Sequence, residues 1–246
     1  MKPVLPLLLL FAAPLTVAAV VPAPQTPSES AAPASSPANK AQPRFDVKVR
    51  NDFFAGFGGD AKLLERGLAT CEAMLKENPE HAEALVWHGA GTLFKAGQMF
   101  QAGEFEKGFS MWQKANEEMD KAVKLAPDNI GVRVARATAL IPASRRAPAP
   151  QQRALLVRAR EDMEAVYKVQ QPQLSKLSEH SRGELLMALA EVYKRAGEND
   201  KAQTILEQVI STCASSPYAE EAGRWLKPAS PSAKFEHVCI GCHTGK

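Results

Sequence analysis

The residues best suited to chemistry lie at the C-terminal end of the chain. Cys239 and Cys242 are separated by two residues, and His243 follows directly. Two thiols at this spacing can each add to one vinyl group of a porphyrin, and the adjacent imidazole can bind the iron axially. With four Cys and five His in the chain, a chance match to this pattern is about one in a thousand. We therefore treat these three residues as the candidate cofactor site.

The arrangement resembles the haem attachment site of c-type cytochromes. The resemblance implies that Cys239 and Cys242 anchor haem c through thioether bonds and that His243 is the proximal iron ligand. It is confined to the motif, because only residues 244–246 follow and a complete cytochrome domain is absent. We therefore expect a haem that is largely exposed or that rests against the rest of the protein.

The second axial ligand would have to come from elsewhere. Candidates are His180, His81, a methionine of segment 97–109, or a second chain, whereas His237 lies too near Cys239 to reach the opposite face of the ring with ease. Other interpretations remain open. They are a zinc site that adds His237 to the motif, a redox-active thiol pair, and a tail with an incidental disulfide. A haem enzyme such as a peroxidase would need a polar distal pocket, which the sequence does not identify.

The N-terminus has the pattern of a secretory signal peptide. Met1-Lys2 carries a positive charge, an apolar run extends from Val4 to Val20, and Val17-Ala18-Ala19 offers small residues for cleavage. This predicts a signal peptide at residues 1–19, export to the periplasm or beyond in a bacterium, and no stable membrane span after cleavage. Haem attachment in bacteria takes place outside the cytoplasmic membrane, so the two predictions support each other.

Residues 20–43 are dominated by Pro, Ala and Ser and contain no aromatic residue. Such a segment buries too little apolar surface to offset its chain entropy. We predict a disordered linker here, followed by a folded domain at residues 44–227 and a short tail at 228–246.

The folded part is rich in Ala and Leu and has no alternating β-branched runs, which predicts an all-α domain. The formal charge of +3 is too small and too dispersed to indicate nucleic-acid binding. P-loop, HExxH and GxSxG motifs are absent from the sequence. We therefore do not expect an enzyme.

Two segments repeat a helix-turn-helix pattern. In the first, Glu83 to Pro127, the residues Trp87, Ala90, Gly91 and Phe94 have the spacing large-x-x-small-Gly-x-x-aromatic. This resembles the tetratricopeptide repeat (TPR), a 34-residue helical hairpin. The resemblance implies stacked antiparallel hairpins in an α-solenoid that presents a surface to protein partners.

The second segment, Gly183 to Pro217, repeats the pattern more regularly. Its packing residues are Leu186, Leu189, Ala190 and Tyr193 in the first helix, Gly197 at the turn, and Ala202, Leu206 and Val209 in the second helix. A half-match includes Cys71, in a helix predicted from Ala61 to Glu77 with Asp60 as its cap.

The first repeat is about twelve residues too long. The excess, residues 97–109, places Phe105, Phe109 and Trp112 at helical spacing, so the second helix should begin early and extend beyond its partner. Ordinary core packing is the preferred interpretation of these rings, and an exposed apolar surface for a partner protein or a haem edge is the alternative.

Four smaller expectations concern short segments and single side chains. Residues 130–170 should form two helices divided by Pro142 and the loop that contains Arg145. Residues 54–60 should form a flexible turn. His88 should be packed or half exposed rather than catalytic, and Cys71 and Cys213 should be buried free thiols.

Together these patterns predict an exported TPR-like scaffold with haem c on its tail, which passes electrons to a protein partner bound by the repeats. The alternative is a secreted scaffold without haem, whose Cys239 and Cys242 form an incidental disulfide or metal site.

Overall fold

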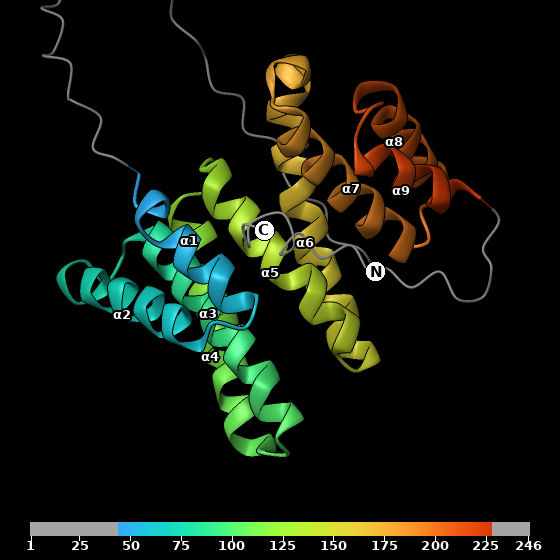
Figure 1. The fold of residues 1–246 in the computed structure, drawn as a ribbon. Coiled ribbons are helices and arrows are strands. Elements are labelled where there is room, and N and C mark those ends of the chain that lie inside the picture. The colour runs from blue at the N-terminus through green and yellow to red at the C-terminus, as the bar shows by residue number, and fades with distance from the viewer. Residues whose placement is uncertain (1–43, 228–246) are drawn as a thin grey trace, which may run out of the picture. The chain divides into compact units, whose positions relative to one another are not determined.

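The computed structural model describes residues 44–227, which form nine α-helices and one short 3-10 helix and include no β-strand (Figure 1). The predicted signal peptide at 1–19, the linker at 20–43 and the tail at 228–246 lie outside the described residues. The elements are α1 (Asp46–Phe57), α2 (Ala61–Glu77), α3 (Ala82–Gln101), α4 (Phe105–Leu125), α5 (Ile130–Arg146), α6 (Ala149–Gln170), η1 (Gln171–Lys176), α7 (Glu179–Arg195), α8 (Asn199–Thr212) and α9 (Pro217–Leu226).

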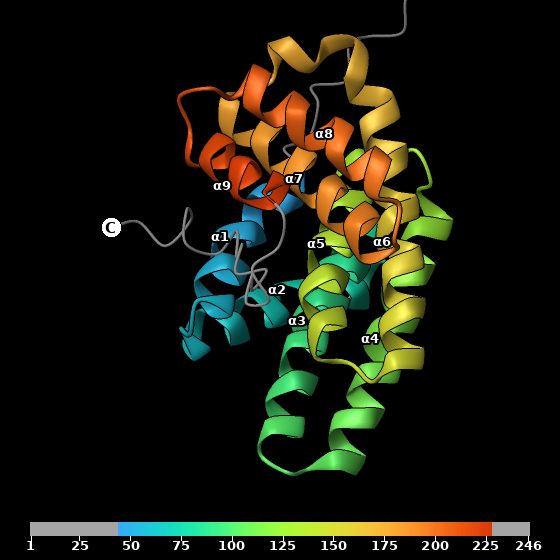
Figure 2. The same ribbon diagram turned by 90° about the vertical axis from the view of Figure 1, so that its right-hand side faces the viewer.

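The α-helices pair in chain order as antiparallel hairpins. The pairs are α1 with α2, α3 with α4, α5 with α6 and α7 with α8, and α9 packs mainly against α8 (Figure 2). The first helix of each hairpin also contacts the first helix of the next one. The prediction of an all-α, TPR-like stack of hairpins is therefore confirmed.

Small residues are needed in the first repeat because aromatic rings of α1 pack directly against α3. The ring of Trp87 stacks on Phe53 of α1 at a centroid distance of 5.3 Å. A Cβ at Gly91 would lie 2.5 Å from the Phe53 ring, which is too close for any non-glycine residue without a shift. Phe94 packs on Phe57 at 5.1 Å. The spacing predicted from the sequence thus brings α3 against α1.

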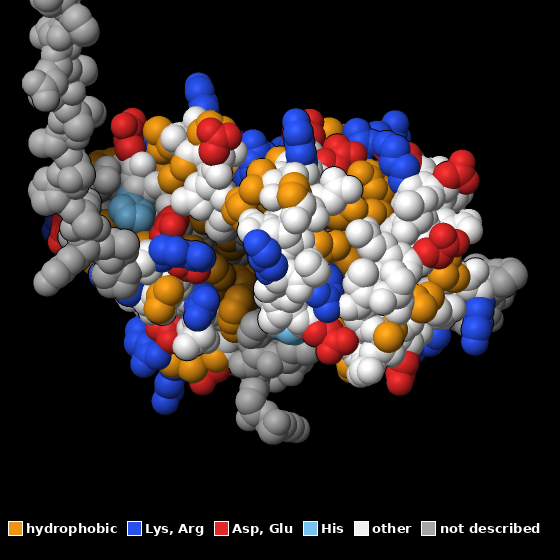
Figure 3. All heavy atoms as spheres, turned by 90° about the horizontal axis from the view of Figure 1, so that it is seen from above, with side chains coloured by type: hydrophobic (Ala, Val, Ile, Leu, Met, Phe, Trp, Pro, Cys, Tyr) orange, Lys and Arg blue, Asp and Glu red, His pale blue; other side chains and the backbone are white. Residues whose placement is uncertain are grey.

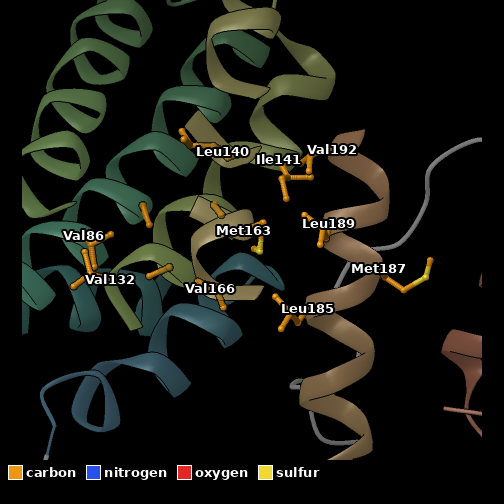
Figure 4. Packing of buried hydrophobic residues seen from close by; sticks show 14 of the residues in the cluster. Val86, Val132, Leu140, Ile141, Met163, Val166, Leu185, Met187, Leu189 and Val192 are labelled. Carbon is orange, nitrogen blue, oxygen red and sulfur yellow. The ribbon is translucent and has the colours of Figure 1, made fainter. Parts of the chain in front are cut away.

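The first helix of the second repeat, α7, buries side chains on two opposite sides. Leu185 and Leu189 of α7 point toward Met163 and Ile141 of the preceding hairpin, whereas Met187 points to the opposite side (Figure 4). All five side chains are buried. The turn after α7 contains Gly197 at φ +81°, the left-handed region that favours glycine, so the predicted turn is confirmed.

A buried ionic network joins the second and third hairpins. Asp162 of α6 is fully buried, and its carboxylate accepts hydrogen bonds from Arg136 at 2.6 Å and from Arg133 at 2.8 Å. Arg136 also donates to Asp120 of α4 at 2.8 Å, and Arg158 of α6 donates to the same carboxylate. The network therefore holds α4, α5 and α6 together through paired charges.

The helix from Ala61 to Glu77 begins and ends as predicted. The Asp60 side chain accepts hydrogen bonds from the backbone N–H groups of Lys62 and Leu63, which confirms its capping role. The expected flexible turn is shorter than predicted, because residues 54–57 belong to α1 and Gly56 packs closely against Leu64.

Residues 130–170 form two helices as predicted, but Pro142 does not divide them. It lies inside α5, where its ring is exposed and only one helix hydrogen bond is lost. Arg145, expected in the dividing loop, instead lies in the last turn of α5. Its guanidinium donates to the buried carboxylate of Glu191 on α7 at 2.8 Å, an interaction that depends on the third and fourth hairpins being neighbours.

Cys71 and Cys213 are both buried free thiols, as predicted. Burial raises the pKa of the Cys71 thiol to about 12 from an ordinary value of 9.0, and the nearby Glu118 and Glu72 carboxylates add to the shift. Cys71 is therefore an unreactive packing residue at neutral pH.

We expect the raised pKa of Cys71 to weaken the fold at alkaline pH. The unfolded chain releases this proton above pH 9 while the folded protein retains it up to about pH 12, so stability is lost across that interval. At about 1.4 kcal/mol per pKa unit, the loss amounts to roughly 3–4 kcal/mol by pH 12. Urea unfolding of wild type and Cys71→Ala between pH 8 and pH 11 would measure it. Parallel declines in the two proteins would contradict the prediction.

Candidate functional site

The predicted haem ligands, Cys239, Cys242 and His243, lie outside the described residues. The structure describes the folded domain, residues 44–227. Two features of that domain bear on function: the histidines proposed as distal ligands and the long α3–α4 hairpin.

His81 and His180, proposed as second axial ligands, both make local hydrogen bonds. The Nδ1 atom of His81 accepts a hydrogen bond from the backbone N–H of Ala84 at 3.1 Å and so caps α3. His180 contacts the Tyr218 hydroxyl through Nδ1 at 2.7 Å and Glu184 through Nε2 at 3.3 Å. An iron ligand with a free Nε2 lone pair carries its proton on Nδ1, so His81 would have to give up its cap to bind iron.

His88 is buried at the base of the α3–α4 hairpin. Its Nδ1 atom lies 2.6 Å from the Glu118 carboxylate of α4, and its Nε2 atom lies 3.5 Å from Glu72 of α2. This histidine links three helices, which agrees with the prediction of a packed residue. Among the described residues, no group of three or more His, Cys, Asp or Glu side chains is arranged to hold a metal ion.

The extra residues of the first repeat lengthen both of its helices. As predicted, the second helix begins early, at Phe105, but it does not extend beyond its partner, because α3 continues to Gln101. Gly103, at φ +78°, makes the turn between them. Residues 97–112, called the hairpin tip below, extend past the ends of α2, α5 and α6 (Figures 1 and 2).

The hairpin tip exposes aromatic rings that were expected to be buried. The residue exposure is 67% for Phe105 and 49% for Phe109, whereas Trp112 is partly buried against the core. The preferred interpretation, core packing, is therefore wrong for the two phenylalanines. The reason is the similar length of α3 and α4, 20 and 21 residues, which carries the N-terminal part of α4 beyond the neighbouring hairpins.

The exposed rings form one row on α4 that leads into a covered region. Phe105, Phe109, Trp112 and Asn116 follow the i, i+4, i+7, i+11 spacing of one helix face. Exposure falls along this row until Asn116, which is only 7% exposed. Asn116 accepts a hydrogen bond from Arg158 of α6, so the Arg158 side chain covers the row at this position.

The rings of the hairpin tip are held in place by their neighbours. Phe109 and Trp112 stack with centroids 5.8 Å apart and an interplanar angle of 13°. Phe100 of α3 packs directly on the backbone of Gly108, where a Cβ would lie 2.7 Å from the ring. The Met99 carbonyl accepts a hydrogen bond from Glu104 N–H at 2.9 Å, which closes the turn. Contacts within the hairpin therefore fix Phe109, Trp112 and the turn.

Charges near the hairpin tip are mixed. Glu104 pairs with Lys107 at 3.2 Å on the turn, and Lys95 pairs with Glu65 of α2 at 2.7 Å. On the side of the molecule away from the tip, basic and acidic side chains are also interspersed, with hydrophobic groups between them (Figure 3). The distinctive chemistry of the hairpin tip is thus aromatic rather than ionic.

No helix within residues 44–227 has the length and apolarity to cross a bilayer.

No family model and no curated protein matches the sequence. Among solved structures, this chain is similar to a thermophilic TPR protein of Thermus thermophilus. The match covers 72% of this chain and 96% of that one, with 18% sequence identity and a TM-score of 0.36. Because that TM-score is low, the TPR-like description rests on the helix pairing and the packing residues described above.

Proposed function

We propose that the protein is an exported helical-repeat scaffold that binds a protein partner and carries covalent haem c on its C-terminal tail, for electron transfer to that partner. Stacked helix hairpins commonly present extended surfaces to other proteins. The observation that carries the interaction role is the exposure of Phe105 and Phe109 on one face of α4, with Phe109 stacked on Trp112. Aromatic residues on a protruding surface are typical anchors of protein interfaces.

The haem part of the proposal is supported by the sequence. Cys239, Cys242 and His243 have the spacing that covalent attachment requires, and the N-terminal pattern predicts export to the compartment where attachment occurs. In this proposal the two thiols anchor the porphyrin and the imidazole binds the iron. The described part of the chain supplies the surface that brings a redox partner near.

We expect the protein, produced with its signal peptide in a host competent for cytochrome c maturation, to carry haem that survives denaturation. A pyridine haemochrome spectrum of the denatured chain should show a c-type α-band. A Cys239→Ala/Cys242→Ala variant should lose the band completely, because no thioether bond can form. Cys71→Ala should retain it, because Cys71 is a buried thiol of the folded domain.

A colourless product from a host that matures a control cytochrome would contradict the haem proposal. The protein would then be a secreted scaffold without haem, with a disulfide or a metal site at Cys239 and Cys242. Free-thiol titration and metal analysis of the same sample would distinguish these two forms.

A further inference from the structure

We infer that a cavity between η1, α7 and α8 binds a carboxylate group, which is held by the guanidinium of Arg182. The cavity measures about 550 Å³, within the range of about 300–1,000 Å³ that is common for small ligands. The site is independent of the haem proposal and of the hairpin tip, and its ligand lies beyond the function proposed above. Its lining consists of Arg182 and the neutral residues Gln171, Pro172, Leu174, Ser175, Gln208 and Thr212.

The cavity exists because the connection between α6 and α7 is longer than the connections between the earlier hairpins. It covers residues 171–178, whereas residues 78–81 join α2 to α3 and residues 126–129 join α4 to α5. The extra length forms η1, whose helical conformation is interrupted at Gln173, with φ −126° and ψ 20°. This segment does not pack as a repeat helix, so a hollow is left between it and the end of α8.

Arg182 has hydrogen-bonding capacity that the folded domain does not use. Its Nη1 atom donates to the carbonyl oxygens of Leu174 and Leu177 at 3.3 and 3.4 Å, longer than the usual range of about 2.7–3.2 Å for N–H···O bonds. Its Nε atom is buried and has no hydrogen-bond partner within residues 44–227. Because both bonds use Nη1, the edge of the guanidinium formed by Nε and Nη2 remains for an acceptor in the cavity.

The same edge of the guanidinium holds a carboxylate elsewhere in this protein. Arg145 donates to Glu191 through Nε at 2.8 Å and through Nη2 at 2.5 Å. Arg66 donates to Asp52 through the same two atoms. Two parallel bonds of this kind match the two oxygens of a carboxylate. Arg182 thus presents the pair of donors that a carboxylate ligand requires.

Arg182 differs from the other arginines that are buried or half-buried within residues 44–227, because no carboxylate of that segment pairs with it. The others form the pairs Arg133–Asp162, Arg136–Asp162, Arg145–Glu191, Arg158–Asp120, Arg160–Glu198 and Arg195–Glu191. A guanidinium stays charged in a protein, and a charge shielded from water is stabilised by a partner of opposite sign. The unused edge of Arg182 therefore points to an anion supplied by a ligand.

The neutral lining favours a carboxylate over a phosphate. One guanidinium balances the single charge of a carboxylate, whereas phosphate sites usually add further cations or backbone N–H groups. The side chain of Gln208 accepts a hydrogen bond from Tyr167 through Oε1 at 2.9 Å, so its NH2 group can donate to a ligand oxygen. Leu174, only 6% exposed, adds an apolar wall. The ligand class is a carboxylate on a short apolar chain, either a free carboxylic acid or the C-terminal end of a peptide.

The test follows the Nε–Hε signal of Arg182 by heteronuclear NMR, in the full-length protein with isotope-labelled arginine. Arg182→Lys identifies the signal, because its spectrum lacks it. The probes are hexanoate, the dipeptide acetyl-Ala-Leu with a free C-terminal carboxylate, the same dipeptide with a C-terminal amide, and inorganic phosphate. We expect the two carboxylates to shift the signal saturably and the amide to leave it unchanged, because the amide lacks the charge and the second oxygen. The tighter-binding carboxylate shows which source of ligand fits the cavity.

Two variants separate ligand binding from a structural role of Arg182, with calorimetry as the measure of affinity. Gln208→Glu adds a carboxylate to the lining of the cavity and should weaken carboxylate binding at least about tenfold, because it occupies the guanidinium and repels the ligand. Arg182→Lys should weaken binding by a similar factor, because an ammonium cannot form two parallel bonds. Arg153→Gln is the matched control, since Arg153 is exposed on α6 outside the cavity and its loss should leave the affinity unchanged.

Any of three results would overturn the inference: equal binding of the amide and the free carboxylate, tighter binding of phosphate than of either carboxylate, or no binding of either carboxylate at up to about 10 mM. Wild-type affinity in Gln208→Glu would also reject this cavity as the site, whether or not Arg182→Lys folds. None of these results affects the haemochrome spectrum, which is measured on denatured protein.

Discussion

Replacing Asp162 by alanine is expected to lower the free energy of unfolding by about 3–5 kcal/mol, the cost of leaving a buried ionic partner unpaired. The Asp162 carboxylate is fully buried and accepts hydrogen bonds from both Arg133 and Arg136. Arg136 is itself only 6% exposed, so water cannot replace the lost carboxylate without a local opening. Urea unfolding followed by circular dichroism would measure the loss.

An exposed ion pair provides the control for Asp162. Glu65→Ala removes the partner of Lys95 at 2.7 Å, but the Glu65 side chain is 60% exposed, so the cost should stay below about 1 kcal/mol. Removing Arg136 together with Asp162 should restore part of the stability, because one unpaired guanidinium is then absent. Equal effects of Asp162→Ala and Glu65→Ala would show that the network contributes no more than a surface pair.

Alanine at Gly91 and alanine at Gly97 should change stability in opposite directions, although both glycines lie in α3. At Gly91 the new Cβ would lie 2.5 Å from Phe53 and 2.9 Å from Leu68, so we expect a loss of about 1–3 kcal/mol from overpacking. At Gly97 nothing lies within 4 Å, and alanine should gain up to about 1 kcal/mol through its higher helix propensity.

Thermal and urea unfolding of the two variants would measure this contrast. The comparison distinguishes two effects on stability, the close approach of α1 to α3 and the general preference of helices for alanine. Only the close approach depends on the position of the glycine. Two stabilised variants would mean that Phe53 moves away without cost and that Gly91 is not needed for packing.

The fold could be predicted from the sequence because its signals are local. The spacing of Trp87, Ala90, Gly91 and Phe94 specifies which residues meet inside a hairpin and against the next helix. Asp60 similarly marks the start of α2, since a cap depends only on the residues that follow it. Patterns of this kind need no knowledge of distant segments.

Other features of the structure depend on contacts between distant segments, which local sequence patterns do not reveal. The helical spacing of Phe105 and Phe109 is the same whether a neighbour covers the row or not, so exposure could not be inferred from spacing. Arg145 and Glu191 are 46 residues apart, and only the stacking of hairpins brings them together. The length of the extra segment, residues 97–109, did indicate that these rings are exposed, because the adjacent hairpins are too short to cover it.

The separation of the hairpin tip from the core affects how the protein can diverge. Phe105 and Phe109 contribute little to burial, while the base of the same hairpin is fixed by Gly91, His88 and Asp120. Substitutions at the outer rings can therefore accumulate without the loss of stability that core substitutions cause. Among descendants of this fold, the surface chemistry at one end of α4 can change while the architecture is inherited unaltered.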